Sequence, residues 1–177
     1  MDKNKKTIRW ITRTAIFIAL LVVVQAATAA LGNQFVTGSA VNLILIVSVM
    51  TCGLSSGAAV AVVSPVLAKL FGIGPLWQIV PMIMVGNLVL VLVWRLLGAR
   101  DPRKVWYPVA LAAAAGCKFG VLWLGVTKWI VPIVLGLPEQ KAAVVSAAFS
   151  WPQLVTALIG GVLAVLVLPV VKKAIKD

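Results

Sequence analysis

The sequence of 177 residues has no histidine, only two cysteines and only four acidic residues. Without histidine a Ser-His-Asp triad is excluded, and Cys52 and Cys117 lie too far apart for zinc-type spacing. No acidic residue falls inside a long apolar run, which leaves an intramembrane enzyme without an acid, a base or a metal ligand. The chain also lacks a GxxxxGK(S/T) segment, so it has no P-loop for nucleotide hydrolysis. We therefore expect no enzyme, no metal site and no cofactor.

Apolar residues are abundant instead, at 62% of the chain, while only 11% are charged. A typical soluble domain is about half apolar and about a quarter charged. A soluble domain of this size would leave apolar patches exposed to water and would aggregate. The sequence therefore predicts an all-α, polytopic membrane protein whose solvent is the bilayer.

The net charge of +12 is concentrated beside the ends of the apolar runs. Three clusters hold most of the basic residues: Lys3, Lys5, Lys6, Arg9 and Arg13; Arg95, Arg100, Arg103 and Lys104; and Lys172, Lys173 and Lys176. This placement follows the positive-inside rule. No cluster is long or interleaved with aromatic residues, so we expect no nucleic acid partner.

Apolar runs near the roughly 20 residues that cross a bilayer predict six spans in a single domain, 1–177. The second and third are short and should extend into their flanking turns or be shielded by neighbours. An even number of spans puts both termini on one side, and a cytoplasmic side gathers all three basic clusters inside. The predicted spans are about 10–31, 39–52, 58–71, 78–97, 105–130 and 144–171.

Lys118 is the most informative polar residue, about 13 residues or roughly 20 Å into the fifth predicted span. A lysine at that depth costs about 3 kcal/mol, so we expect it to face the bundle interior or a water-filled cavity. The alternative is that it snorkels outward along the helix or donates to a carbonyl of a neighbouring helix. Because no acid lies within a span, an anionic or carbonyl-bearing ligand could partner it, together with amides such as Asn87.

Other polar and aromatic residues lie in the middle or outer half of the predicted spans, which favours a pocket open to the outside. The tryptophans also suit an interfacial belt, and Asn42 also suits a hydrogen bond between helices. We expect residues 32–38 to form a lid hinged at Gly32 and Gly38. With Lys118, the candidate substrate-binding residues are Asn33, Gln34, Thr37, Asn42, Lys69, Trp77, Gln78, Asn87, Trp123, Ser150, Trp151 and Gln153.

Helical spacing predicts two shared faces among these residues. Ser146, Ser150 and Gln153 are spaced i, i+4, i+7 along the sixth predicted span. Lys118 and Trp129 are separated by close to three full turns of the fifth. Each set is therefore expected on one side of its helix.

Ala15 and Ala19 place two small side chains on one face of the first span, which allows another helix to approach closely. The alternative is packing inside the bundle. This AxxxA follows basic residues in a chain of six spans, and AAAAGCKFGVLWLGV contains the pair Lys118-Phe119. Over the whole length, this arrangement resembles the substrate-binding S component of an energy-coupling factor (ECF) vitamin transporter.

The resemblance implies that a bacterial cell membrane protein captures a small water-soluble vitamin outside. A membrane scaffold subunit and two cytoplasmic ATPases would energise uptake, with Ala15 and Ala19 against the scaffold. The loops near 32–38, 72–77 and 131–141 would help to bind the ligand. One lysine among amides favours a pantothenate-like ligand, with a pyridoxine-like one second. The alternative function is a stand-alone ion-coupled transporter of a small organic solute, but intramembrane carboxylates and inverted repeats are not evident.

Overall fold

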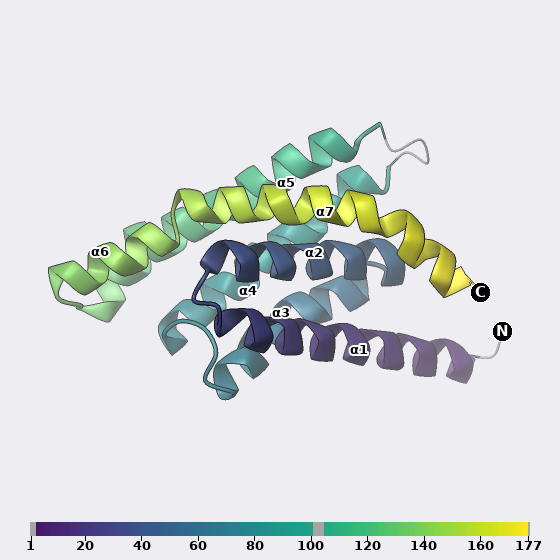
Figure 1. Ribbon diagram of the computed structural model, residues 1–177, viewed down its shortest axis with the longest axis horizontal. Helices are drawn as coiled ribbons and strands as arrows, with labels where there is room; N and C mark the ends of the chain where they lie inside the picture. Colours follow the sequence, from purple (N-terminus) through teal and green to yellow (C-terminus); the bar gives the residue numbers. More distant parts are fainter. Residues whose placement is uncertain (1–2, 101–104, 177) are drawn as a thin grey trace.

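The computed structural model describes residues 3–100 and 105–176, and Arg103 and Lys104 of the second basic cluster lie outside them. The described residues form helices joined by turns and contain no strand, which confirms the all-α prediction (Figure 1). A 3-10 turn, η1 (Trp77–Ile79), precedes α4, and the π-helical segments η2 (Trp94–Gly98) and η3 (Trp123–Leu135) continue α4 and α5. The α-helices are α1 (Lys3–Ala29), α2 (Gln34–Cys52), α3 (Leu54–Leu70), α4 (Val80–Val93), α5 (Tyr107–Leu122), α6 (Glu139–Ala148) and α7 (Trp151–Lys176).

Within residues 3–100 and 105–176, five helical segments are long and apolar enough to cross a membrane, and α3 is a shorter apolar helix of 17 residues. The second predicted span, about 39–52, is longer in the structure, because α2 begins at Gln34. Asn33 caps it, with Oδ1 accepting a hydrogen bond from the backbone N–H of Phe35 at 2.9 Å. Residues 32–38 are therefore not one loop. Gly38 lies inside α2 and cannot act as the predicted hinge, whereas Gly32 has a φ of 62° in the turn.

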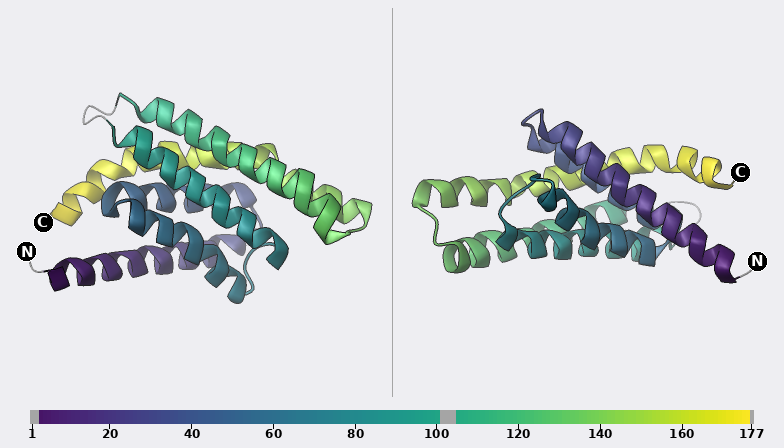
Figure 2. Two further views of the ribbon diagram at one scale, coloured as in Figure 1. Left: turned by 180° about the vertical axis from the view of Figure 1, so that it is seen from behind. Right: turned by 90° about the horizontal axis from the view of Figure 1, so that it is seen from below.

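The bundle has two distinct ends (Figures 1 and 2). One end carries the start of α1, the turn between α2 and α3, and the end of α7. The other end carries the turns that follow α1, α3 and η3. Helix α2 packs against α1, α3 and α7. Both ends of the described chain therefore lie at the same end of the bundle.

The sixth predicted span is two helices, α6 and α7, separated at Phe149 and Ser150. Pro152 explains the break, because it has no N–H to donate to the carbonyl of Ala148 four residues earlier, and its ring would clash there. The side-chain Nε2 atoms of Gln34 and Gln153 donate to that carbonyl instead, at 3.2 and 3.0 Å. The predicted common face of Ser146, Ser150 and Gln153 is wrong, because they do not belong to one continuous helix.

The helix after Lys118 also departs from regular α geometry. Its π-helical continuation, η3, runs to Leu135, so the following turn begins at Gly136 rather than near residue 131. The wider π turns change the angle between successive side chains. Trp129 in η3 is consequently 53% exposed, while Lys118 in the preceding regular helix α5 is buried, and the predicted shared face of these two residues is wrong. The end of η3 and helix α6 project beyond the rest of the bundle (Figure 1).

The main core depends on small residues where helices approach closely, as is usual in membrane bundles. Ala110, Ala114, Ala157 and Ala164 are buried in it, in the same cluster as the fully buried Trp94. Gly160 of α7 is the closest approach to α2. A Cβ at this position would lie 2.5 Å from the backbone oxygen of Ser39 and 2.6 Å from Cβ of Asn42. The α2–α7 packing therefore requires glycine at 160.

We expect Gly160→Ala to destabilise the protein by about 1–3 kcal/mol, because backbone atoms of α2 must shift to admit the methyl group. Gly116→Ala in α5 is the matched control. A Cβ there meets nothing within 4 Å, so alanine should be neutral or stabilising by up to about 1 kcal/mol. Unfolding midpoints in detergent would compare the two variants. Equal midpoints would show that α2 and α7 do not pack as closely as described.

Candidate functional site

A cavity of about 350 Å³ lies at the end of the bundle opposite the chain termini. It is formed by α1, α2, α4, α5, α7 and the end of α6, by the turns after α1 and α3, and by the junction between α6 and α7. This volume is at the small end of the range for ligand pockets, about 300–1,000 Å³. The lining residues are Gln25, Ala29, Gly32, Asn33, Gln34, Thr37, Gly38, Val41, Asn42, Ile73, Gly74, Pro75, Ile83, Asn87, Lys118, Leu122, Ala148, Phe149 and Gln153.

Lys118 occupies the wall of this cavity and is only 4% exposed. Its ammonium donates to Oδ1 of Asn42 on α2 at 2.6 Å and to Oδ1 of Asn87 on α4 at 2.8 Å. These contacts exclude the snorkelling arrangement. An ammonium has three N–H donors, so two amide oxygens leave one for a ligand. Among the lining residues, Lys118 alone carries a formal charge, so the amides solvate the ammonium without neutralising it.

The packing of α2 against α7 positions Asn42 beside Lys118. Nδ2 of Asn42 donates to Oγ1 of Thr156 at 3.5 Å, and that hydroxyl donates to the backbone oxygen of Gln153 at 3.2 Å. Thr156 in turn packs against Gly38, where an added Cβ would lie 2.9 Å from Cγ2. Asn42 therefore links α5 to α7 by the hydrogen bonds between helices that the sequence predicted. It also lines the cavity.

The junction between α6 and α7 forms another part of the cavity wall. The carbonyl of Ala148 is held by the side chains of Gln34 and Gln153, so both glutamines have protein partners. Phe149, at this junction, is 8% exposed and lines the cavity. The two glutamines thus contribute to the site by fixing the position of this junction.

About half of the predicted substrate-binding residues come together in the cavity. They come from four helices, α2, α4, α5 and α7, and from the turn before α2, which are far apart in sequence. Asn87 and Lys118 were predicted to be neighbours, and the structure places them in direct contact. The predicted residues that line the cavity are Asn33, Gln34, Thr37, Asn42, Asn87, Lys118 and Gln153.

The other predicted residues lie outside the lining. Trp123 stacks with Phe119 at a centroid distance of 6.4 Å, and Nζ of Lys128 lies 5.0 Å from the Trp123 ring. Trp151 is 60% exposed and lies 5.6 Å from the ring of Phe35 in an adjoining hollow. These aromatic rings therefore contact residues outside the cavity. From Trp123 onward, the π-helical geometry of η3 also directs side chains away from the helix face that carries Lys118.

Polar candidates near the turns are also excluded from the lining. Oγ of Ser150 donates to the backbone oxygen of Ala147 at 2.7 Å, as expected at a helix junction. Lys69, Trp77 and Gln78 lie near the turn after α3, but the cavity takes Ile73, Gly74 and Pro75 from this turn instead. The predicted loop 131–141 contributes no lining residue.

Gln25 is a lining residue that the sequence reasoning missed. It is a polar residue within the first apolar run. A polar side chain inside an apolar span also pointed to Asn87, and the same criterion would have identified Gln25. Its Oε1 atom is buried and has no hydrogen-bond partner among the described residues. Phe149 could not have been found in this way, because its position depends on the break at Pro152.

Ala15 and Ala19 are both exposed on α1, whose buried face carries Thr14 and Leu21 instead. Only 11% of the most apolar 18-residue stretch of α1 is buried, and Figure 1 shows the helix at the edge of the bundle. Packing of this alanine pair inside the bundle is thereby excluded. The pair is available to lipid or to another protein.

Comparison with known proteins adds one decisive similarity. The family of the ECF transporter substrate-specific component matches residues 9–172. No curated protein and no solved structure matches the chain. The match covers nearly all of the helical bundle and confirms the resemblance seen in the sequence. This family consists of membrane proteins that bind small molecules and act with ECF partner subunits. The chain therefore belongs to the substrate-specific components of ECF transporters.

Proposed function

We propose that this ECF component captures a small, carboxylate-bearing vitamin or related micronutrient in the cavity around Lys118. The observation that carries the proposal is a buried ammonium bonded to two neutral amides and to no acid among the cavity residues. A buried charge of this kind is costly unless it is paired. A ligand carboxylate would supply the missing negative charge and accept the remaining N–H of Lys118.

Gln25 adds a second requirement for the ligand. Its buried Oε1 atom has no donor in the part of the chain that the structure describes, and an unsatisfied buried acceptor costs about 1–3 kcal/mol. A ligand hydroxyl or amide N–H at this side of the cavity would relieve that cost. A pantothenate-like acid carries a carboxylate together with hydroxyl and amide groups, whereas a pyridoxine-like ligand carries hydroxyls and no carboxylate. The first therefore fits both requirements better.

Transport then needs partners that the chain does not contain. The sequence has no P-loop, so two cytoplasmic ATPases would supply the energy through a membrane scaffold subunit. The exposed face of α1 at Ala15 and Ala19 is the surface we assign to that scaffold. We infer that both termini lie in the cytoplasm, which the placement of the basic clusters supports, and that the cavity at the opposite end of the bundle opens toward the outside of the plasma membrane.

A comparison of each candidate acid with its uncharged methyl ester tests the proposal. We expect the acid to bind at least about tenfold more tightly, because only the acid pairs a negative charge with the ammonium of Lys118, whereas the ester offers a neutral acceptor. Isothermal titration calorimetry on the detergent-solubilised protein would measure both dissociation constants. The two molecules differ little in shape, so equal constants would show that the site does not recognise an anion.

A further inference from the structure

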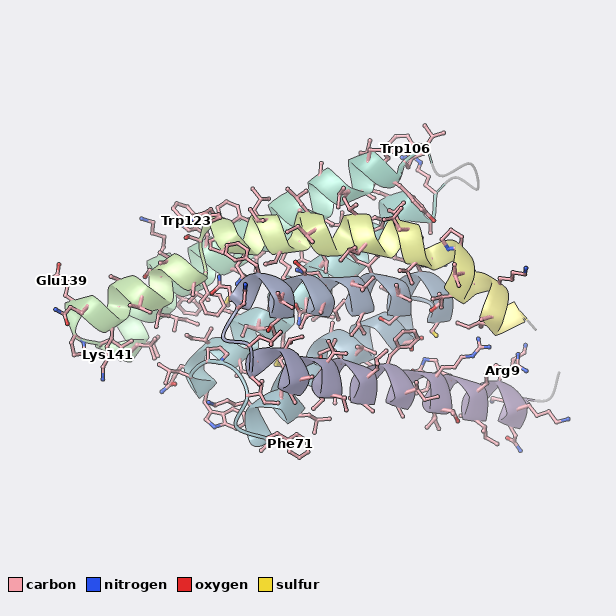
Figure 3. All side chains as sticks on the ribbon, viewed as in Figure 1. Arg9, Phe71, Trp106, Trp123, Glu139 and Lys141 are labelled. Carbon is pink, nitrogen blue, oxygen red and sulfur yellow. The ribbon has the colours of Figure 1, made fainter. Side chains whose placement is uncertain are left out.

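A separate groove of about 840 Å³ lies between the first turns of α1 and the last turn of α7. It shares no residue with the cavity around Lys118 and lies at the opposite end of the bundle. Figure 3 shows Arg9 on α1 at this end, near the end of α7. The lining residues are Lys5, Ile8, Arg9, Thr12, Arg13, Ile16, Phe17, Ala174 and Ile175.

The chemistry of the groove changes along α1 from cationic to apolar. Lys5, Ile8 and Arg9 lie nearest the end of the bundle, Thr12 and Arg13 follow, and Ile16 and Phe17 lie deeper along the helix. From residue 5 to residue 16 the axial rise is about 16 Å. Ile16 is nevertheless 59% exposed, so the deeper part of the groove presents apolar surface.

The positive charge of the groove is not offset within the described part of the chain. Glu139 is the only acidic residue in the described ranges, and it lies at the far end of the bundle (Figure 3). Nη2 of Arg13 donates to the backbone oxygen of Ile175 at 3.3 Å, which fixes α7 against α1. Lys5 and Arg9 are exposed on the open side of the groove. An anionic group could therefore bind there.

We propose that this groove binds one anionic phospholipid. Its phosphodiester contacts Lys5 and Arg9, the hydroxyl of Thr12 donates a further hydrogen bond, and one acyl chain lies along Ile16 and Phe17. Basic pockets between helices at the cytoplasmic side of a membrane suit anionic headgroups. A free phosphate would leave the apolar half of the groove uncovered, so the occupant that matches both halves is a lipid. The proposal does not depend on which ligand the other cavity takes.

Native mass spectrometry of the detergent-solubilised protein, titrated with phosphatidylglycerol or phosphatidylcholine, tests this site. We expect one phosphatidylglycerol to be retained in preference to phosphatidylcholine. Lys5→Gln/Arg9→Gln should weaken phosphatidylglycerol binding on the order of tenfold, because each basic side chain near the headgroup contributes to the attraction. Lys128→Gln/Lys141→Gln removes the same charge from residues outside the groove and should leave binding unchanged.

Four results would overturn the lipid site. The first is equal retention of the two lipids, and the second is an equal loss of binding in the two double variants. The third is displacement of the lipid by millimolar inorganic phosphate, which would mark a free-anion site. If Lys5→Gln/Arg9→Gln instead keeps the lipid and loses only scaffold binding, the groove belongs to a protein interface and the lipid assignment also fails.

Discussion

Lys118→Met should lower ligand affinity by about ten- to a hundredfold. The change removes a charge-assisted hydrogen bond, which contributes about 1.5–3 kcal/mol, while keeping much of the length of the side chain. Calorimetric titration of the wild type and the variant would measure the difference. Lys128→Met is the matched control, because Lys128 is exposed and does not line the cavity. Its affinity should equal that of the wild type.

Lys118 also bonds to Asn42 and Asn87. A loss of affinity in Lys118→Met could therefore arise from disturbed packing of these helices and not from a lost contact with the ligand. Asn87→Asp separates the two roles, because it keeps the lysine and places an anion beside it. We expect this variant to fold and to bind the ligand more weakly, since the aspartate competes with the ligand carboxylate. If Lys118→Met and wild type bind with equal affinity, the lysine has only a structural role.

Ala15→Leu combined with Ala19→Leu should abolish uptake and association with the scaffold subunit. Both alanines are exposed, and two larger side chains would prevent a partner helix from approaching closely. Ligand binding to the isolated protein should remain, because neither alanine lines the cavity. Co-purification with the scaffold and calorimetry on the isolated protein would measure the two effects separately.

Ala112→Leu is the control for this surface, because it makes the same change at an exposed alanine on α5. We expect it to leave scaffold association intact. Association that survives the double change on α1 would place the interface on another face of the bundle. Loss of ligand binding in the double variant would instead indicate that α1 no longer packs correctly.

The sequence was informative where the chemistry of a residue allows only a few structural environments. A lysine deep in an apolar run must be buried with polar partners, which led to Lys118 and its neighbour Asn87. The placement of basic residues predicted an even number of spans, and both ends of the described chain do lie at one end of the bundle. The short third span was likewise predicted, and α3 has 17 residues.

The errors arose where regular helical spacing was assumed across an irregularity. The π-helical segment η3 changed the angular positions of residues after Lys118, so Trp129 faces outward. A π turn depends on packing and has no simple sequence signature. Pro152 did carry a local signal for the break before α7, which the long apolar run obscured. Tryptophans are ambiguous for another reason, because an interfacial belt and a pocket favour the same residue type.

The identity of the small molecule that co-purifies with the protein tests the central claim most directly. Mass spectrometry of the molecule released from gently purified protein would provide it. The account predicts a small acid with at least one hydroxyl or amide group, retained by wild type and lost from Lys118→Met. A cationic or wholly apolar molecule retained equally by both proteins would contradict it.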